Sequence, residues 1–360
     1  MNALIDRGDA QARASSTRMF REAAEAASVV AAQFAANRDV LAALAADLRR
    51  RPPPFVATCA RGSSDHAATY AKALLETRLG VVTASVSPSI GSVYGVPQRL
   101  RDALFIAVSQ SGKSPDLLRN AEAARDAGAR VVALVNVADS PLAALADVVV
   151  PLHAGPERSV AATKSYLASL SAILQLVALW SDDFALLDAL DRLPGALRAA
   201  WECDWSEAAS GLAPAHNLFV LGRGLGLGAA QEAALKFKET CGLHAEAYSS
   251  AEVKHGPMAL VGPGFPVLIF AQPDQTEAGT LALADEFRGR GARVWLASRD
   301  AGADPGSSPG QALPVAAAPH PACAPLLMVQ SFYRMVNLLS LARGHDPDRP
   351  PHLNKVTETV

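Results

Sequence analysis

Ionisable side chains gather in one stretch of the second half of the chain, EAALKFKETCGLHAEAYSSAEVKH. They include Glu232, Lys236, Glu239, His244, Glu246, Glu252, Lys254 and His255. On a helix, Glu232, Lys236 and Glu239 share one face, because they are spaced at i, i+4 and i+7. This face could be a surface salt-bridge stripe, but the surrounding Ala, Leu and Phe are too apolar for a solvated helix. We therefore predict that these charges meet other groups in a cleft.

Two further residues could take part in acid–base or carbonyl chemistry. His255 precedes Gly256-Pro257, a turn-forming pair that predicts a loop and not a helix interior. Histidine and carboxylate side chains together can open a sugar ring and move a proton between adjacent carbons. Lys355 lies in the C-terminal tail, where lysine is ordinarily solvated. A tail that folds over a site could instead use this amine against a carbonyl.

A second candidate is the serine-rich loop in FIAVSQSGKSP, residues 105–115. The Gly-Lys-Ser end suggests a nucleotide-binding P-loop, but that motif needs glycine where this chain has Ala107, so the spacing excludes it. A phosphate site remains possible, since Gly112 lets the backbone approach closely and a helix is predicted to begin near Ser114. The donors would be Ser109, Gln110, Ser111 and Ser114. The alternative is a serine loop that only caps the helix.

An internal repeat indicates how these segments are positioned. VATCARGSSDHA from residue 56 aligns with LFVLGRGLGLGA from residue 218, which places Arg61 162 positions before Arg223. Gln110 and Gln272 are also 162 apart, and the later segments AGARVVALVN and RGARVWLASR keep the offset to within one residue. We infer a tandem duplication. The second copy of the serine loop, AQPDQTE, is acidic and lacks Ser and Gly, so only the first copy is predicted to bind phosphate.

Apolar runs alternate with helical periodicity, which predicts two tandem α/β domains, each with a parallel sheet. Strands of the first copy are predicted at 55–59, 81–85, 104–108, 130–135 and 148–151, and helices at 64–78, 114–127 and 165–180. The expected divisions are a leader and helix (1–49), a sugar-phosphate-binding domain (50–200), a catalytic domain (201–345) and a tail over the site (346–360). One amphipathic helix is predicted over 17–49. Residues 300–325 predict a surface loop with a short strand at 312–315.

Composition limits the classes of function. The 360 residues are 50% apolar and 19% charged, with a net charge of −2 and no basic run interleaved with aromatics, so nucleic acid is not an expected partner. No apolar stretch reaches the ~18 residues of a membrane span, and no signal peptide is found, so we expect a cytoplasmic protein. The four cysteines form no C-x-x-C pair, so neither a disulfide framework nor a zinc site is predicted. No metal or other cofactor is expected.

Several motifs together resemble the tandem sugar isomerase (SIS) family, and especially the isomerase half of glutamine–fructose-6-phosphate aminotransferase. They are RGSSDHA, SQSGKSPD, AGPERSVAATKSY, LGRG, EAALKFKE, HAEAYSSAEVKHGPMAL and the tail NKVTETV. The resemblance covers nearly the whole chain and implies a flavodoxin-like three-layer α/β/α fold for each domain.

The resemblance also implies roles for residues. The sugar phosphate would be held by Gly62, Ser63, Ser64, Ser109, Gln110, Ser111 and Ser114, with Val160 beside the sugar. Glu239 would carry the proton between C1 and C2, and Lys236 would support the enediolate-like charge. His255 would open the ring, reaching across the interface of a homodimer, and Lys355 would meet the open-chain carbonyl. Ala162 stands where the family commonly has Ser, which leaves the role of that position open.

The chain enters the first domain soon after Met1-Asn2, without the N-terminal cysteine nucleophile of a glutaminase domain, so we expect no ammonia production from glutamine. The resemblance then favours a glucosamine-6-phosphate deaminase, with a phosphorylated amino sugar as the ligand. The alternatives are another aldose–ketose isomerase, an aminotransferase-type isomerase subunit, a fructosamine-6-phosphate deglycase or a galactosamine-6-phosphate deaminase. A non-enzymatic phosphosugar sensor fits less well, because it would need a DNA-binding motif. Such a sensor would also have no use for Glu239, His255 and Lys355.

Overall fold

The structure, a computed structural model, describes residues 7–299 and 311–355. The chain forms two compact units. Of the described residues, the first unit contains 28–157 and 164–194, and the second contains 7–27, 158–163, 195–299 and 311–355. Part of the low-complexity stretch (300–310) and the end of the predicted tail (356–360) lie outside the described residues.

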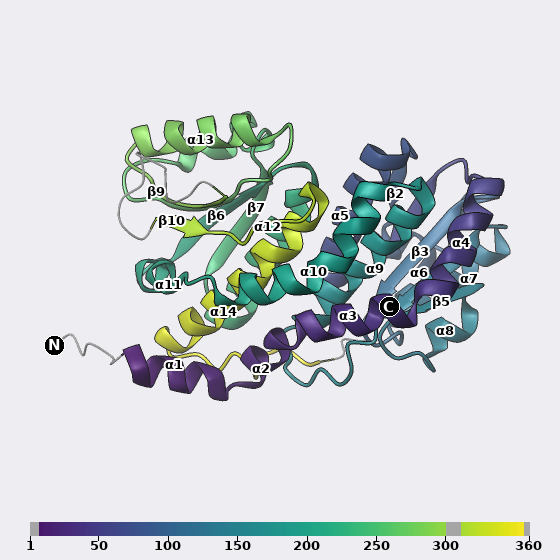
Figure 1. Ribbon diagram of the computed structural model, residues 1–360, viewed down its shortest axis with the longest axis horizontal. Helices are drawn as coiled ribbons and strands as arrows, with labels where there is room; N and C mark the ends of the chain where they lie inside the picture. Colours follow the sequence, from purple (N-terminus) through teal and green to yellow (C-terminus); the bar gives the residue numbers. More distant parts are fainter. Residues whose placement is uncertain (1–6, 300–310, 356–360) are drawn as a thin grey trace. The chain divides into compact units, whose positions relative to one another are not determined.

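The first unit contains a five-stranded parallel sheet in the order β2-β1-β3-β4-β5 (Figure 1). Its strands are β1 (Val56–Cys59), β2 (Thr83–Ser85), β3 (Leu104–Ser109), β4 (Arg130–Val135) and β5 (Val148–Pro151). Helices lying wholly or mostly in this unit are α3 (Ala26–Ala36), α4 (Arg38–Arg50), α5 (Ser63–Leu79), α6 (Pro88–Ser92), α7 (Pro115–Asp126), α8 (Pro141–Leu145), α9 (Lys164–Ser181) and α10 (Phe184–Glu202).

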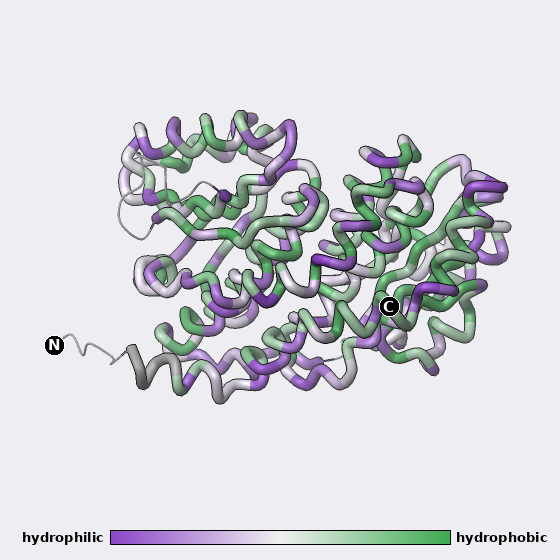
Figure 2. The backbone as a smooth tube through the Cα atoms, in the orientation of Figure 1, coloured by the Kyte–Doolittle hydropathy of each residue, from purple (hydrophilic) through white to green (hydrophobic). Residues whose placement is uncertain are grey.

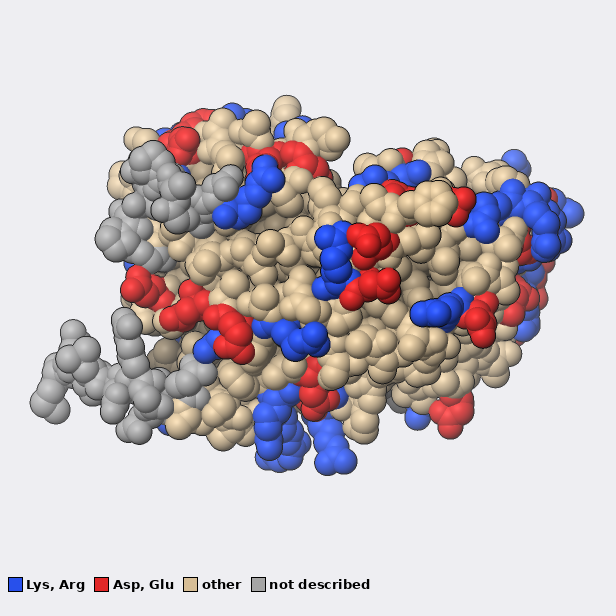
Figure 3. All heavy atoms as spheres, viewed as in Figure 1, with Lys and Arg blue, Asp and Glu red and all other residues tan. Residues whose placement is uncertain are grey.

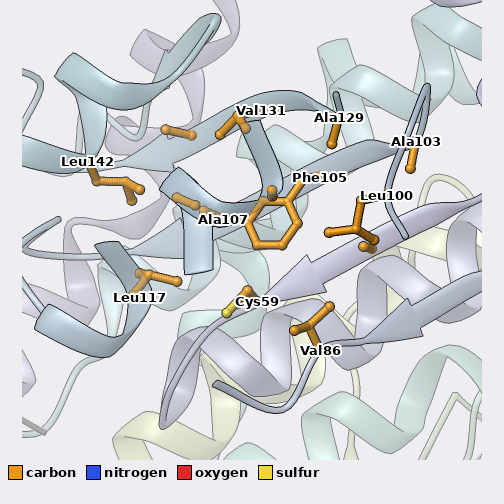
Figure 4. Close-up of a cluster of buried hydrophobic side chains, with 14 of the residues drawn as sticks. Cys59, Val86, Leu100, Ala103, Phe105, Ala107, Leu117, Ala129, Val131 and Leu142 are labelled. Carbon is orange, nitrogen blue, oxygen red and sulfur yellow. The ribbon is translucent and has the colours of Figure 1, made fainter. Parts of the chain in front are cut away.

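The strand predictions rested on continuous apolar runs, and burial explains why they succeeded. All six residues of β3 are buried, as expected for a central parallel strand covered on both faces. On one face, Phe105 packs in a cluster that includes Leu117, Val131 and Leu142 (Figure 4). Hydropathy follows this pattern in Figure 2, where the strands of the sheet are mostly hydrophobic. The core therefore fixes β3, and with it the loop that follows Ser109.

The second unit repeats this architecture, with a parallel sheet in the order β7-β6-β8-β9-β10. Its strands are β6 (Asn217–Gly222), β7 (His244–Ser249), β8 (Pro266–Phe270), β9 (Arg293–Ser298) and β10 (Ala312–Pro314). Its helices are α1 (Arg7–Ser16), α2 (Arg18–Ala24), α11 (Ser206–Leu212), α12 (Leu227–Cys241), α13 (Glu277–Gly289) and α14 (Ala324–Ala342), with short 3₁₀ turns η1 (Gly224–Gly226), η2 (Glu252–His255), η3 (Pro257–Leu260) and η5 (Pro321–Cys323).

Strand order and register are the same in both sheets. Ala57 lies beside Phe105 in the first sheet, and Phe219 lies beside Val267 in the second. Each residue of the second pair is 162 positions after its counterpart in the first. The prediction of two tandem α/β domains, each with a parallel sheet flanked by helices, is confirmed.

The prediction of one amphipathic helix over 17–49 is wrong. The segment forms α2, α3 and α4, and the residues before it form α1. Thr17 adopts an extended backbone and its hydroxyl accepts the N–H of Phe20, which starts α2. Asn37 separates α3 from α4, and its side chain donates to the carbonyl of Pro151 at 2.8 Å and lies 3.1 Å from Nε2 of His153. These capping and tertiary contacts override the helical periodicity.

None of the described helices is, by itself, long and apolar enough to cross a membrane, and α3 with α4 passes that test only as a bent pair. The face shown in Figure 3 carries basic and acidic side chains interspersed, with no broad field of one sign. This distribution matches the small net charge of the chain.

Candidate functional site

The serine loop, residues 109–114 of the first unit, connects β3 to α7. Gly112 takes φ +64°, and the buried Oγ of Ser109 accepts its N–H at 2.9 Å. Ser109 is predicted as a ligand donor, and in this structure its hydroxyl also shapes the loop. The two roles are compatible, because accepting this N–H leaves the hydroxyl's own hydrogen to be donated. Oγ of Ser111 accepts the N–H of Lys113 at 3.3 Å. Ser114 is the N-cap of α7 without a side-chain cap bond, so the capping alternative does not account for its hydroxyl.

Packing holds the serine loop from behind. A Cβ at Gly112 would lie 2.2 Å from Oγ of Ser140 and 2.9 Å from the Cγ2 of Val135. The carbonyl of Gly112 also accepts the N–H of Leu142 at 3.1 Å. Only glycine fits this combination of positive φ and close contact. The loop is therefore a rigid feature, with Gln110, Ser111 and Ser114 half-buried at its outer side.

A second glycine turn lies at the same edge of the sheet. Gly62 takes φ +55° just before α5, and none of the described residues, apart from its chain neighbours, lies within 4 Å of the position its Cβ would occupy. Cys59 of β1 lies beside Ala107 of β3, so this turn and the serine loop both follow the carboxyl ends of neighbouring parallel strands. Ligands of open α/β sheets bind at this edge, and the starts of α5 and α7 present amides that favour anions.

An ion pair joins the two turns. Nε of Arg61 donates to Oδ2 of Asp116 at 2.8 Å, and a terminal nitrogen of Arg61 lies 2.7 Å from the same oxygen. Asp116 is fully buried in the first turn of α7. Burial raises the pKa of the nearby Asp65, and the charges of His66 and Arg61 oppose that rise. The Arg61–Asp116 pair fixes the spacing of the two turns.

The acidic and basic face of α12 in the second unit is largely buried. Nζ of Lys236 lies 2.6 Å from Oε2 of Glu239 and 3.3 Å from Oε1 of Glu232, and Tyr333 of α14 donates its hydroxyl to Glu232 at 2.9 Å. Lys236 and Glu232 are fully buried, whereas the side chain of Glu239 is 21% exposed. Burial lowers the pKa of Lys236, but the two carboxylates outweigh it and raise that pKa above its usual range. The surface-stripe alternative is therefore excluded, and Glu239 is the member open to solvent.

The other predicted catalytic residues lie on short irregular segments. His255 ends the short 3₁₀ turn η2 before Gly256, which takes φ +139°, so it lies at a turn and not in a helix interior, as predicted. His255 is exposed, and within the described residues no hydrogen-bond partner of its ring is found. Lys355 is half-buried at the end of the described chain. Val160 donates its N–H to the carbonyl of Asp348 at 3.4 Å.

The sequence profile of the SIS domain matches residues 56–179 and 211–305. The chain belongs to the SIS-domain family. It is 35% identical over 305 residues to the isomerizing glutamine–fructose-6-phosphate aminotransferase of Sulfurisphaera tokodaii, which covers 83% of this chain and 49% of that protein. The chain thus spans about half the length of the curated relatives it matches.

Two solved structures are similar to this chain over nearly its whole length. A protein of Silicibacter pomeroyi, provisionally named a phosphosugar isomerase, is 45% identical with a TM-score of 0.86 over 92% of this chain and 100% of its own. A glucosamine-6-phosphate deaminase of Thermotoga maritima superposes with a TM-score of 0.74 over 95% of this chain and 100% of its own. At 20% identity, the second likeness shows the fold alone.

The second SIS copy contains a counterpart of the serine loop, residues 271–277, that has no serine. Gln272, the counterpart of Gln110, is buried and donates to the carbonyl of Pro321 at 2.8 Å. Asp274 accepts the N–H and the hydroxyl of Thr276 at 2.8 and 2.7 Å, so its carboxylate is used within its own turn. This loop presents an acidic group and no serine, and phosphate binding by the first copy alone stays a prediction.

Sequence reasoning missed two polar residues that support the SIS sites. Tyr333 lies on α14, whose residues are almost all buried and give no signal of a polar role. Asp116 follows Ser114-Pro115, which predicts a helix start and nothing more. An acidic residue in a first helical turn is ordinarily exposed, so its complete burial was the unseen feature.

Proposed function

We propose that this protein converts glucosamine 6-phosphate and water to fructose 6-phosphate and ammonia. One observation carries the proposal: the partly exposed carboxylate of Glu239 lies 2.6 Å from the ammonium of the buried Lys236. A carboxylate fixed in this way is suited to carrying a proton. The rigid serine loop and Gly62 turn, and relatives named for phosphosugars, support the same substrate class.

The proposed reaction consists of ring opening, a proton shift and hydrolysis. Ring opening exposes the C1 aldehyde, and we assign this step to His255. Glu239 removes the C2 proton and returns it to C1, and a proton from the C2 amine passes to O1, so that O1 becomes a hydroxyl and an imine is left at C2. Water adds to the imine carbon, the C–N bond breaks, and ammonia leaves a ketone. Lys236 stabilises charge that develops on oxygen, and Lys355 meets the open-chain carbonyl.

The remaining assignments concern binding and organisation. We propose that the phosphate is held by Gly62, Ser63, Ser64, Ser109, Gln110, Ser111 and Ser114, with Val160 beside the sugar. We propose a binding domain (50–200), a catalytic domain (201–345) and a tail (346–360), with the segment 158–163 of the binding domain grouped in the second compact unit. A cytoplasmic homodimer that shares His255 and needs no cofactor completes the proposal.

The test is an assay with purified protein and glucosamine 6-phosphate in which ammonia and fructose 6-phosphate are both measured. Equal amounts of the two products are expected. Isomerised sugar without ammonia would identify a phosphosugar isomerase, the activity named for the relative from Silicibacter pomeroyi. No turnover of glucosamine, galactosamine or fructosamine 6-phosphate would overturn the proposal. Ser111→Ala should raise the KM, and an unchanged KM would argue against the serine loop as the phosphate site.

A further inference from the structure

Two carboxylates of the second unit bond to backbone amides of distant segments. Oδ2 of Asp348 accepts the N–H of Arg18, and Oδ1 accepts that of Met19, both at 2.8 Å. Oε1 of Glu22 accepts the N–H of Arg158 at 2.6 Å, and Oε2 accepts that of Ser159 at 3.1 Å. The two side chains therefore connect α2, the segment 158–163 and the start of the C-terminal tail.

The burial and hydrogen bonding of these residues show that the arrangement is well ordered. Glu22 is 7% exposed, and Met19 and Ser159 are fully buried. A buried carboxylate is tolerated when its oxygens are satisfied, and here both oxygens of each carboxylate accept an amide. The helix that carries Glu22 is itself fixed to α14, because Gln330 donates to the carbonyl of Ala23 at 3.0 Å. Asp348 is set in a turn, since its N–H donates to Asp346 at 2.9 Å.

The segment 158–163 and the tail also contact each other. Val160 donates to the carbonyl of Asp348 at 3.4 Å, and Oγ of Ser159 lies 3.5 Å from the carbonyl of Pro347. These bonds are longer than those of the carboxylates, so the carboxylates determine the geometry. Lys355 is seven residues beyond Asp348. A chain of that length reaches about 25 Å when extended, so the anchor limits the volume that the Lys355 amine can occupy.

We infer that Asp348 and Glu22 are positioning residues that hold Val160 and the tail leading to Lys355 in place for the sugar. The inference rests on the proposed function, in which Val160 and Lys355 contact the substrate. Asp348 acts on both segments, because it binds α2 through its side chain and Val160 through its carbonyl. Glu22 acts only on the segment that contains Val160. The two residues should therefore differ in their effects on turnover.

The experiment compares Asp348→Asn and Glu22→Gln with two controls on exposed carboxylates of the same unit, Asp285→Asn and Glu202→Gln. Each amide variant keeps the shape of the side chain, but its NH₂ group faces one backbone N–H and loses that bond. Hydrogen–deuterium exchange should accelerate about tenfold at the Arg18 and Met19 amides in Asp348→Asn, and at the Arg158 and Ser159 amides in Glu22→Gln. The controls should leave these amides unchanged.

Kinetics with glucosamine 6-phosphate then separate the roles. Asp348→Asn should lower kcat and raise the KM, each about tenfold, whereas Glu22→Gln should raise the KM and keep kcat within about twofold. The inference alone is overturned if the wild-type enzyme converts the phosphosugar and both variants have the same kcat, KM and amide exchange rates as the wild type. A wild-type protein that turns over no phosphosugar overturns the proposed function and the positioning role with it. If Asp348→Asn does not fold, Asp348→Ser replaces it, because its hydroxyl can still accept one backbone N–H. The Arg18 and Met19 amides of Asp348→Ser should then exchange at an intermediate rate. Exchange at the wild-type rate in this variant would count against the inference.

Discussion

Arg61 lies 2.8 Å from the fully buried carboxylate of Asp116, and this pair joins the Gly62 turn to the first turn of α7. Arg61→Met removes the ion pair and leaves the buried Asp116 carboxylate without this cation, although its Oδ1 still accepts the N–H of Leu117 at 2.7 Å. We expect the free energy of unfolding to fall by ~2 kcal/mol, because the guanidinium is 47% exposed and the pair is only partly desolvated. The KM for the phosphosugar should rise about tenfold as the two turns lose their fixed spacing. Urea unfolding and steady-state kinetics measure the two effects.

The duplication supplies the control for this prediction. Arg223 is the counterpart of Arg61, but Ala278 stands 162 positions after Asp116, so the ion pair has no equivalent there. Arg223→Met should leave both the KM and the stability close to those of the wild-type protein. Equal effects of the two substitutions would show that the Arg61–Asp116 pair does not organise the site.

Gly112→Ala tests the rigidity of the serine loop. The added Cβ would meet Oγ of Ser140 at 2.2 Å on a backbone at φ +64°, so we expect a loss of ~3 kcal/mol from strain and overpacking. Gly62→Ala is the matched variant, since its φ of +55° and ψ of −133° also strain an alanine but no described residue crowds the added Cβ, and ~1–2 kcal/mol is expected. Thermal unfolding compares them, and a larger loss for Gly62→Ala would contradict the packing argument.

Glu239→Gln tests the proton carrier. The amide keeps the contact with Lys236 but cannot accept a proton, so kcat should fall by about 10²–10⁴ while substrate binding is retained. Calorimetric titration with the phosphosugar measures binding separately from turnover. Glu246→Gln, on the exposed carboxylate that accepts the Tyr248 hydroxyl at 3.0 Å, should retain activity. Residual activity of Glu239→Gln within threefold of the wild type would assign the proton transfer elsewhere.

Lys236→Met should destabilise the protein by ~4 kcal/mol, because it leaves the buried carboxylate of Glu232 without its cation. The pKa of Lys236 is raised, so its contribution is complete below the ordinary lysine pKa and is lost only as the pH rises through the higher value. Between about pH 6 and about pH 9, Lys236 of the wild-type protein should therefore stay charged, and its contribution to the free energy of unfolding should not change. The difference in stability between the wild type and Lys236→Met should be constant over this range, because Lys236 stays charged throughout it.

Chemical denaturation at several pH values measures this difference, and the exposed Lys238→Met is the control. A loss in Lys236→Met no larger than that in Lys238→Met would show that the ion pairs of Lys236 with Glu232 and Glu239 do not stabilise the protein.

The fold was largely predictable because its signals are local and repeated. β3 and β4 are short apolar runs, and the offset of 162 positions made each copy a check on the other. The boundaries of the N-terminal helices were not predictable, because they depend on contacts such as that between Asn37 and Pro151, which are 114 positions apart.

The site was predictable in its residue types but not in its connections. The spacing of Glu232, Lys236 and Glu239 on one face follows from helical geometry alone. Their burial depends on Tyr333, 101 positions after Glu232, and no periodicity encodes such a pair. Ser109 shows a role that spacing did not reveal, because its hydroxyl accepts a backbone N–H of its own loop, while its part in binding a ligand stays a prediction.

The six residues from Arg158 to Thr163 belong to the second unit, although the residues on either side of them belong to the first. Their partners Glu22 and Asp348 precede and follow both copies of the duplicated domain. A fragment of residues 50–200 would therefore retain this segment without either partner. The boundary between the copies is not a point at which the chain can be divided without loss of the contacts of residues 158–163.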